Sequence, residues 1–240
     1  MVAWRLFGRH RTYGNGLARA SLRGWIYLLV AVCGSAVLPG LSRTLGPARA
    51  PLAAATLVVY WWGAVLHLVP FESGAGYCRA LAVDFVVITA AYTAHVGVYC
   101  GRSPATAASL ALSATVAAAN VAAVANGRDI QYDASARRAR LACGIPHTLL
   151  LAAVEWSRAG DARLGALVVG GKLAAFLYFY LGGRIDAPTH FKFATIPGKW
   201  DVHENFHVAV LGVHLAQVLA VGRQAGPGPY DHLCTAQDYS

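Results

Sequence analysis

Long, uninterrupted runs of hydrophobic residues alternate with short polar breaks along most of this chain. An α-helix rises about 1.5 Å per residue, so about 20 apolar residues cross the roughly 30 Å hydrocarbon core of a bilayer. The runs 104–125 and 164–182 are continuous, whereas the strands of a membrane barrel would alternate polar and apolar residues. Because a backbone in lipid must satisfy its own hydrogen bonds, the pattern predicts an all-α integral membrane protein.

Seven hydrophobic blocks are long enough to be transmembrane helices, and Pro, Gly and charged residues separate them. They cover residues 24–40, 51–70, 78–100, 104–126, 139–155, 163–182 and 205–222. The sequence therefore predicts one seven-helix transmembrane domain at 24–222. A basic segment, 1–23, precedes it and a short polar tail, 223–240, follows it. There is no internal repeat and no sign of a second domain.

The composition agrees with a membrane protein, because 57% of the residues are hydrophobic and only 13% are charged. A soluble domain carries about 25% charged residues. The net charge is +9, but the basic residues lie at the ends of the apolar blocks, so a nucleic-acid partner is not expected. The scattered cysteines have no CxxC spacing and are interpreted as small apolar residues; they are Cys33, Cys78, Cys100, Cys143 and Cys234.

The distribution of lysine and arginine predicts the orientation in the membrane. The side that receives the N-terminus holds 13 of them, the opposite side holds six, and Lys172 lies inside the sixth span. The positive-inside rule then places the N-terminus in the cytosol and the C-terminus on the far side. Two alternatives stay open. Residues up to 34–36 could be a cleaved signal peptide, leaving six spans, or the acid-free start before Glu72 could be an organelle transit sequence. The sequence does not distinguish the plasma membrane from an endomembrane.

A group of potential metal ligands shares the cytosolic face in this topology. His67 ends the second span, Asp84 lies in the first turns of the third, and His203 and His207 open the seventh. The i, i+4 spacing puts the last two imidazoles on one side of a helix, where both can bind one ion. Three histidines and a water, with Asp84 nearby, make the open arrangement of catalytic zinc. The alternative is a set of interfacial polar residues that are hydrogen-bonded to loops.

The segment His203-Glu204-Asn205-Phe206-His207 also fits the H-E-x-x-H pattern of zinc proteases, in which the glutamate is the general base. Such enzymes usually take a third ligand from downstream. This chain has no glutamate after Glu204, and only Asp231 and Asp238 follow in the tail. An intramembrane metalloprotease is therefore a third-ranked alternative.

Three further histidines and one lysine of the predicted spans also need an interpretation. His95 and His147 are expected to be packed histidines that bond backbone carbonyls. His214 lies two turns beyond His207 on the same face, where it could relay protons or bond a neighbouring helix. Lys172 is expected to extend toward the outer interface, because long basic side chains can reach water from about two turns inside a span.

Three segments are similar to a known superfamily. Gly63-Ala-Val-Leu-His67 stands where that superfamily has S-x-x-x-H, and the segment from Asp84 resembles its D-x-x-x-I. Pro197-Gly-Lys-Trp-Asp before His203-x-x-x-His207 resembles its P-G-[KR]-x-D and final histidine pair. The chain resembles the seven-span superfamily that includes the adiponectin/progestin receptors (PAQR family), bacterial hemolysin III, alkaline ceramidases and myomaker-type proteins. The family serine is Gly63 here.

The resemblance implies a zinc ion held by His67, His203 and His207, with Asp84 in contact with its water. From this the leading hypothesis is a zinc-dependent membrane hydrolase that cleaves a lipid amide or ester, as a ceramidase does. The lipid would enter from the cytosolic leaflet, and Asp84 would take the proton. A non-enzymatic receptor or membrane-remodelling protein with structural zinc is the second hypothesis. Whether the chain turns over a substrate stays open at this stage.

Overall fold

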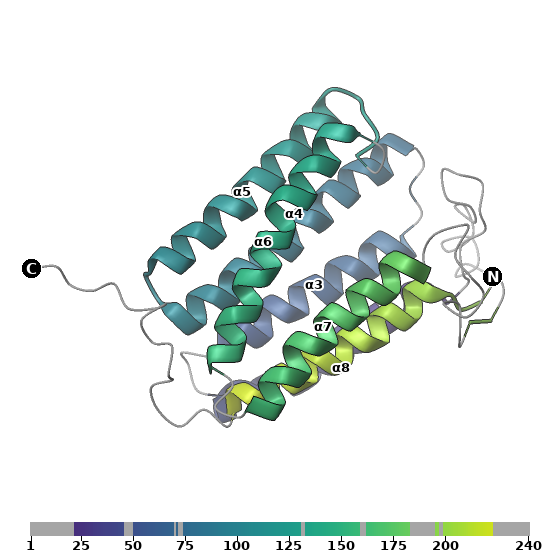
Figure 1. Ribbon diagram of the computed structural model, residues 1–240. Helices are drawn as coiled ribbons and strands as arrows, with labels where there is room; N and C mark the ends of the chain where they lie inside the picture. The colour runs from purple at the N-terminus through teal and green to yellow at the C-terminus, as the bar shows by residue number, and fades with distance from the viewer. Residues whose placement is uncertain are drawn as a thin grey trace, which may run out of the picture.

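A computed structural model describes residues 22–45, 50–69, 71, 74–130, 133–158, 162–182, 195–196 and 199–222. This part of the chain contains seven α-helices and, apart from an isolated bridge between Ile196 and Trp200, no β-structure, so the all-α prediction is confirmed (Figure 1). The helices are α2 Trp25–Leu45, α3 Ala50–Leu68, α4 Gly74–Cys100, α5 Pro104–Ala125, α6 Ala134–Arg158, α7 Ala162–Gly182 and α8 Val202–Gly222. The basic segment up to residue 21 and the tail 223–240 lie outside the described residues.

Three helices, α2, α4 and α6, are at least four residues longer than their hydrophobic blocks, and α4 begins at Gly74 where residue 78 was expected. The first was expected to end at Gly40, but α2 continues through Pro39 to Leu45. The fifth was expected to start at residue 139, but α6 begins at Ala134, where the Asp133 carboxylate accepts a hydrogen bond of 2.8 Å from the Ala136 amide. Such caps satisfy the free amides of a first turn outside the apolar block, so hydropathy alone misses them.

Four of the helices in the described part of the chain are long and apolar enough to cross a membrane. These stretches are Trp25–Thr44, Ala50–Leu68, Ala75–Cys100 and Pro104–Ala125. Large apolar side chains point outward on several helices, such as Leu29, Leu110 and Leu215, each about 60% exposed. A soluble monomer rarely exposes so much apolar surface, which agrees with a protein surrounded by lipid.

The helices pack as a closed bundle in which each contacts its neighbours in sequence and α2 contacts α8. Figure 1 shows α4, α5 and α6 grouped on one side, with α3, α7 and α8 on the other. Because consecutive helices are antiparallel, the end of α3 lies at the same end of the bundle as the starts of α2, α4 and α8. We call this the histidine end, since His67, His203 and His207 lie there.

One cysteine does not fit its sequence interpretation. Cys100, the last residue of α4, is disulfide-bonded, whereas Cys33, Cys78 and Cys143 are free. It lies at the end of the bundle opposite the histidines. A persistent disulfide is typical of an oxidising compartment, so the disulfide favours an orientation in which this end of the bundle faces such a compartment.

Candidate metal centre

The structure brings together the three histidines that the sequence singled out. His67 lies in the last turn of α3, and His203 and His207 lie in the first two turns of α8. One potential ligand atom of each lies within 4.8 Å of the others. The ring centroids are 5.1 Å apart for His67 and His203, and 4.3 Å apart for His203 and His207. This wide spacing must close to about 3–4 Å for ligands that share one zinc ion.

The start of α8 is fixed by a capping box. The Asp201 carboxylate accepts a 2.8 Å hydrogen bond from the His203 amide, and the Glu204 carboxylate accepts one of 2.9 Å from the Asp201 amide. Together these two bonds satisfy amides that the first helical turn leaves free. They fix where the helix begins, and therefore which face carries His203 and His207.

Arg23 ties the start of α2 to this capping box. Its buried guanidinium donates hydrogen bonds of 2.6 Å to Glu204 and to Asp201, across 181 and 178 residues of sequence. Burial raises the pKa of the Asp201 carboxyl, but its hydrogen bond with Glu204 and the charge of Arg23 outweigh this and lower the pKa overall. Glu204 is only 2% exposed, and its oxygens are occupied by Arg23 and the Asp201 amide. It is therefore poorly placed to be the general base of a protease.

Tyr27 is part of the cluster, although it belongs to none of the motifs that the sequence shows. Its hydroxyl oxygen lies 2.7 and 2.8 Å from the two ring nitrogens of His207. Its ring centroid is 4.3 Å from that of His207 and 5.2 Å from that of His67. One sequence feature could have indicated such a neighbour. Gly63 lies one turn before His67, and a glycine at that position leaves room for a large side chain from another helix.

Two glycines give the first helix close access to the histidines. Gly24 has a positive φ of 89°, and a Cβ there would lie 2.8 Å from the His67 Cβ. A Cβ at Gly63 would lie 2.3 Å from two atoms of the Tyr27 ring. Both contacts are shorter than real Cβ atoms tolerate, so glycine at these positions is what allows α2 to pack against α3 at the histidine end.

Asp84 lies in the third turn of α4, half-buried, and outside the three-histidine group. The three histidines of the expected coordination sphere therefore lie together, whereas Asp84 is not part of their group. Three imidazoles are a donor set that zinc accepts.

A second polar cluster lies deeper in the bundle, around Glu155 of α6. Lys172 of α7 donates a 2.5 Å hydrogen bond to Glu155, and Gln217 of α8 donates another. His95 of α4 lies 3.7 Å from the same carboxylate and 3.0 Å from the Thr56 hydroxyl. Lys172 thus points into the bundle and pairs with an acid, which corrects the expectation that it reaches the outer interface. His95 contacts side chains, where backbone carbonyls had been expected.

The remaining two histidines of the predicted spans also bond side chains. His214 Nδ1 lies 2.9 Å from the Tyr60 hydroxyl, which is the helix-to-helix alternative of its two sequence interpretations. His147 Nε2 lies 2.6 Å from the Ser109 hydroxyl, in place of the expected backbone carbonyl. Both contacts join neighbouring helices, as polar side chains in membrane bundles commonly do.

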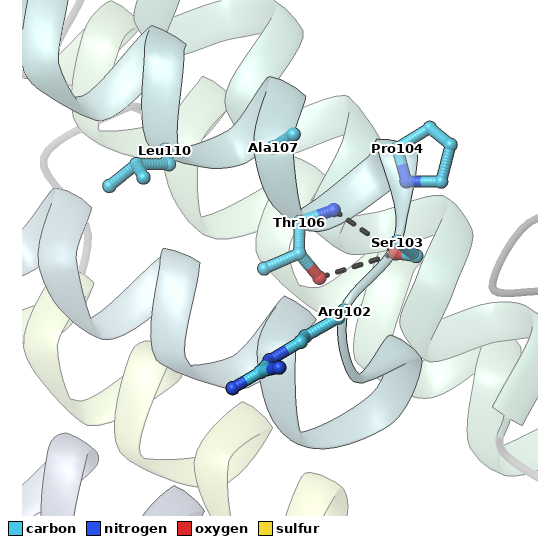
Figure 2. A pocket seen from close by; sticks show the side chains of 6 residues that line it. All are labelled: Arg102, Ser103, Pro104, Thr106, Ala107 and Leu110. Carbon is cyan, nitrogen blue, oxygen red and sulfur yellow. Dashed lines mark hydrogen bonds between the residues drawn. The ribbon is translucent and has the colours of Figure 1, made fainter. Parts of the chain in front are cut away.

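A surface depression of about 430 Å³ lies at the start of α5, at the end of the bundle opposite the histidines (Figure 2). Its lining is mainly apolar, and the Thr106 amide and hydroxyl both bond Ser103, the cap of α5. It holds no cluster of groups suited to catalysis. The residues around it are Arg102, Ser103, Pro104, Thr106, Ala107 and Leu110.

Comparisons with protein-family models, with curated proteins and with solved structures give no match. The functional argument is therefore carried by the histidine cluster and by the groups that surround it.

Proposed function

We propose that all seven helices cross the membrane, with the histidine end on the cytosolic side. The helices α6, α7 and α8 have 25, 21 and 21 residues, enough to cross about 30 Å, and they pack in the same bundle as the four apolar spans. The excess of lysine and arginine falls at the histidine end. The disulfide-bonded Cys100 falls at the other end, which suits an oxidising compartment.

We further propose that the chain is a zinc-dependent hydrolase of a lipid amide or ester. The observation that carries this is the convergence of His67, His203 and His207 from two helices at one end of the bundle. A zinc ion at this site would polarise a carbonyl group and activate a water molecule. Asp84 takes up the proton released during hydrolysis, since Glu204 and Asp201, the two carboxylates at the start of α8, are both bound to Arg23.

The substrate class follows from the position of the site. The histidines lie within about two turns of the helix ends, which is the depth of the amide and ester linkages of membrane lipids below the surface. Such a lipid would reach the site from the cytosolic leaflet without leaving the bilayer. The similarity of the three sequence segments to the PAQR, hemolysin III and ceramidase superfamily supports the same assignment.

A second function is favoured by one departure from that superfamily. Gly63 stands in place of its serine, so the hydroxyl that the superfamily has on α3 is missing. If hydrolysis requires that hydroxyl, the chain would be a receptor or membrane-remodelling protein with structural zinc. The protease alternative has lost support, because Arg23 and the helix cap occupy Glu204.

Metal analysis and lipid hydrolysis by the detergent-purified protein test the proposal. We expect one zinc per chain in the parent and its loss in His207→Ala, because two histidines hold the ion much less tightly than three. Asp84→Asn should keep the metal but lower turnover by about 10²–10⁴-fold, since it removes the base and keeps the size. His147→Gln, which changes a histidine outside the cluster, is the matched control.

The outcomes separate the hypotheses. Chelator-sensitive hydrolysis with the expected ranking supports the enzyme. Bound zinc without hydrolysis of a broad lipid panel, together with unfolding of His207→Ala, would indicate a structural metal. A parent that binds no zinc would exclude both zinc-dependent functions.

A further inference from the structure

The Tyr27 side chain is held rigidly at the centre of the histidine cluster. Its ring contacts His67 and His207, and it lies 5.8 Å from the ring of Tyr60 on the next turn of α3 toward the bundle centre. The ring also packs against the backbone of Gly63, where no space is left for a side chain. A half-buried phenol that packs against these rings and against Gly63 has few rotamers open to it, so its hydroxyl has a defined location.

That location is beside the two ring nitrogens of His207. One ring nitrogen of His207 must face the metal position, and the Tyr27 hydroxyl lies within hydrogen-bond distance of both nitrogens. The hydroxyl therefore lies beside the three-histidine cluster, at which the carbonyl group of a bound lipid would react.

We propose that Tyr27 is a substrate-binding residue whose hydroxyl donates a hydrogen bond to the carbonyl oxygen of the bound lipid. The inference rests on the proposed hydrolase and names a residue that belongs to none of the motifs that the sequence shows. A phenol can donate one hydrogen bond and accept others, so the Tyr27 hydroxyl can accept a hydrogen bond from a His207 ring N–H while it donates its own to the lipid oxygen. A fixed donor aimed at a carbonyl oxygen stabilises the charge that develops there during hydrolysis.

The same geometry explains Gly63. The superfamily serine would place its Cβ 2.3 Å from the Tyr27 ring, so serine at position 63 and tyrosine at position 27 exclude each other in this packing. The two positions depend on each other, because Gly63 of α3 makes room for the Tyr27 side chain of α2, which carries a hydroxyl. The chain thus lacks the serine and still has a hydroxyl at the site.

Cobalt-substituted full-length protein in detergent gives a readout that does not depend on turnover. The visible absorption of bound Co²⁺ is titrated with a short-chain N-acyl lipid to find the half-saturating concentration. Tyr27→Phe keeps the ring over Gly63 and removes only the hydroxyl. We expect it to bind the same amount of Co²⁺ and to require about tenfold more lipid, the loss of one hydrogen bond at the upper end of its usual strength. Hydrolysis should fall by about 10²–10³-fold.

Two controls separate this role from a structural one. Tyr92→Phe removes another hydroxyl from the bundle, one whose ring packs against His147 and not against His67, His203 or His207, and it should leave the titration unchanged. Gly63→Ala should reproduce the weakened lipid binding with the phenol still present, because its methyl group displaces the ring. Gly212→Ala in α8 makes the same change where a Cβ meets no atom within 4 Å, and should behave as the parent.

Each result has a distinct meaning. Equal lipid titrations for the parent and Tyr27→Phe overturn the inference while the hydrolase proposal stands. Loss of Co²⁺ in Tyr27→Phe alone also overturns it, because Tyr27 would then be a metal ligand. A parent that binds no Co²⁺ refutes the proposed function and this inference with it.

Discussion

Removing the positive charge from the second polar cluster should destabilise the protein strongly. Lys172 and Glu155 form a 2.5 Å ion pair in which the side chains are only 12% and 2% exposed. Lys172→Met keeps the length of the side chain and leaves the Glu155 carboxylate buried. Loss of one partner of a buried pair typically costs about 3–5 kcal/mol. Gln217 and His95 remain near the carboxylate, so we expect a value near 3 kcal/mol.

The double variant Lys172→Met/Glu155→Gln should recover most of that loss. It removes the unpaired charge and keeps an amide that can bond Gln217. Replacing a buried ion pair by neutral groups of similar volume is often neutral or even stabilising, because the desolvation of both charges is avoided. The expected signature is therefore a large cost for the single change and a small one for the double change.

Unfolding of the purified protein in mixed micelles, with increasing fractions of denaturing detergent, measures these free energies. Arg79→Met is the control, because it removes a basic residue from an exposed position of α4. If Lys172→Met costs less than about 0.5 kcal/mol, as this control should, Lys172 reaches water and the inward ion pair does not form in the membrane. If the double variant is as unstable as the single one, packing outweighs charge at this position.

Three further predictions concern the topology of the chain and the residues at the histidine end. Protease protection of terminal tags in sealed vesicles should place the N-terminus in the cytosol and the C-terminus on the far side, and tags on one side would contradict seven spans. Glu204→Gln should lower the unfolding temperature but reduce the rate of hydrolysis less than about tenfold. A reduction of about 10²-fold or more would indicate that Glu204 is a general base, as in the H-E-x-x-H proteases. Asp201→Asn keeps a good helix cap and removes a carboxyl with a lowered pKa, so it should destabilise the protein at neutral pH. That difference from the parent should vanish as the pH falls through the lowered pKa, and a difference that persists in acid would mean that the Asp201 charge contributes nothing.

The positions of the helices and the meeting of the three histidines follow from features that are local in the sequence. Continuous apolar blocks predict the spans, and an alternating up-and-down path puts the end of the second helix beside the start of the seventh. The i, i+4 spacing then aligns His203 with His207. Helix ends were less predictable, because a cap such as Asp133 lies outside the apolar block and adds more than a turn to α6.

Tyr27, Arg23 and the true direction of Lys172 could not be predicted in this way. Each depends on which helices become neighbours, and the partners of Arg23 lie about 180 residues away in sequence. Hydropathy treats Tyr27 as one more residue of an apolar run, and it treats Lys172 as a charge that should reach water. Only the packing of α2 against α8 and of α7 against α6 shows their partners.

One face of α8 carries residues of both polar clusters and so connects them along the inside of the bundle. His203, His207, His214 and Gln217 are separated by 4, 7 and 3 residues, so they fall on one face of a helix with 3.6 residues per turn. Val208 and Leu215, between them in sequence, are about half exposed on the opposite face. Tyr27 and Tyr60 reach this stripe from α2 and α3 and bond His207 and His214. In lipid such a stripe is stable only when other helices cover it and supply partners for its polar groups. The glycines that let α2 approach are therefore part of the design of the site, because without that approach His207 would have no hydroxyl beside it.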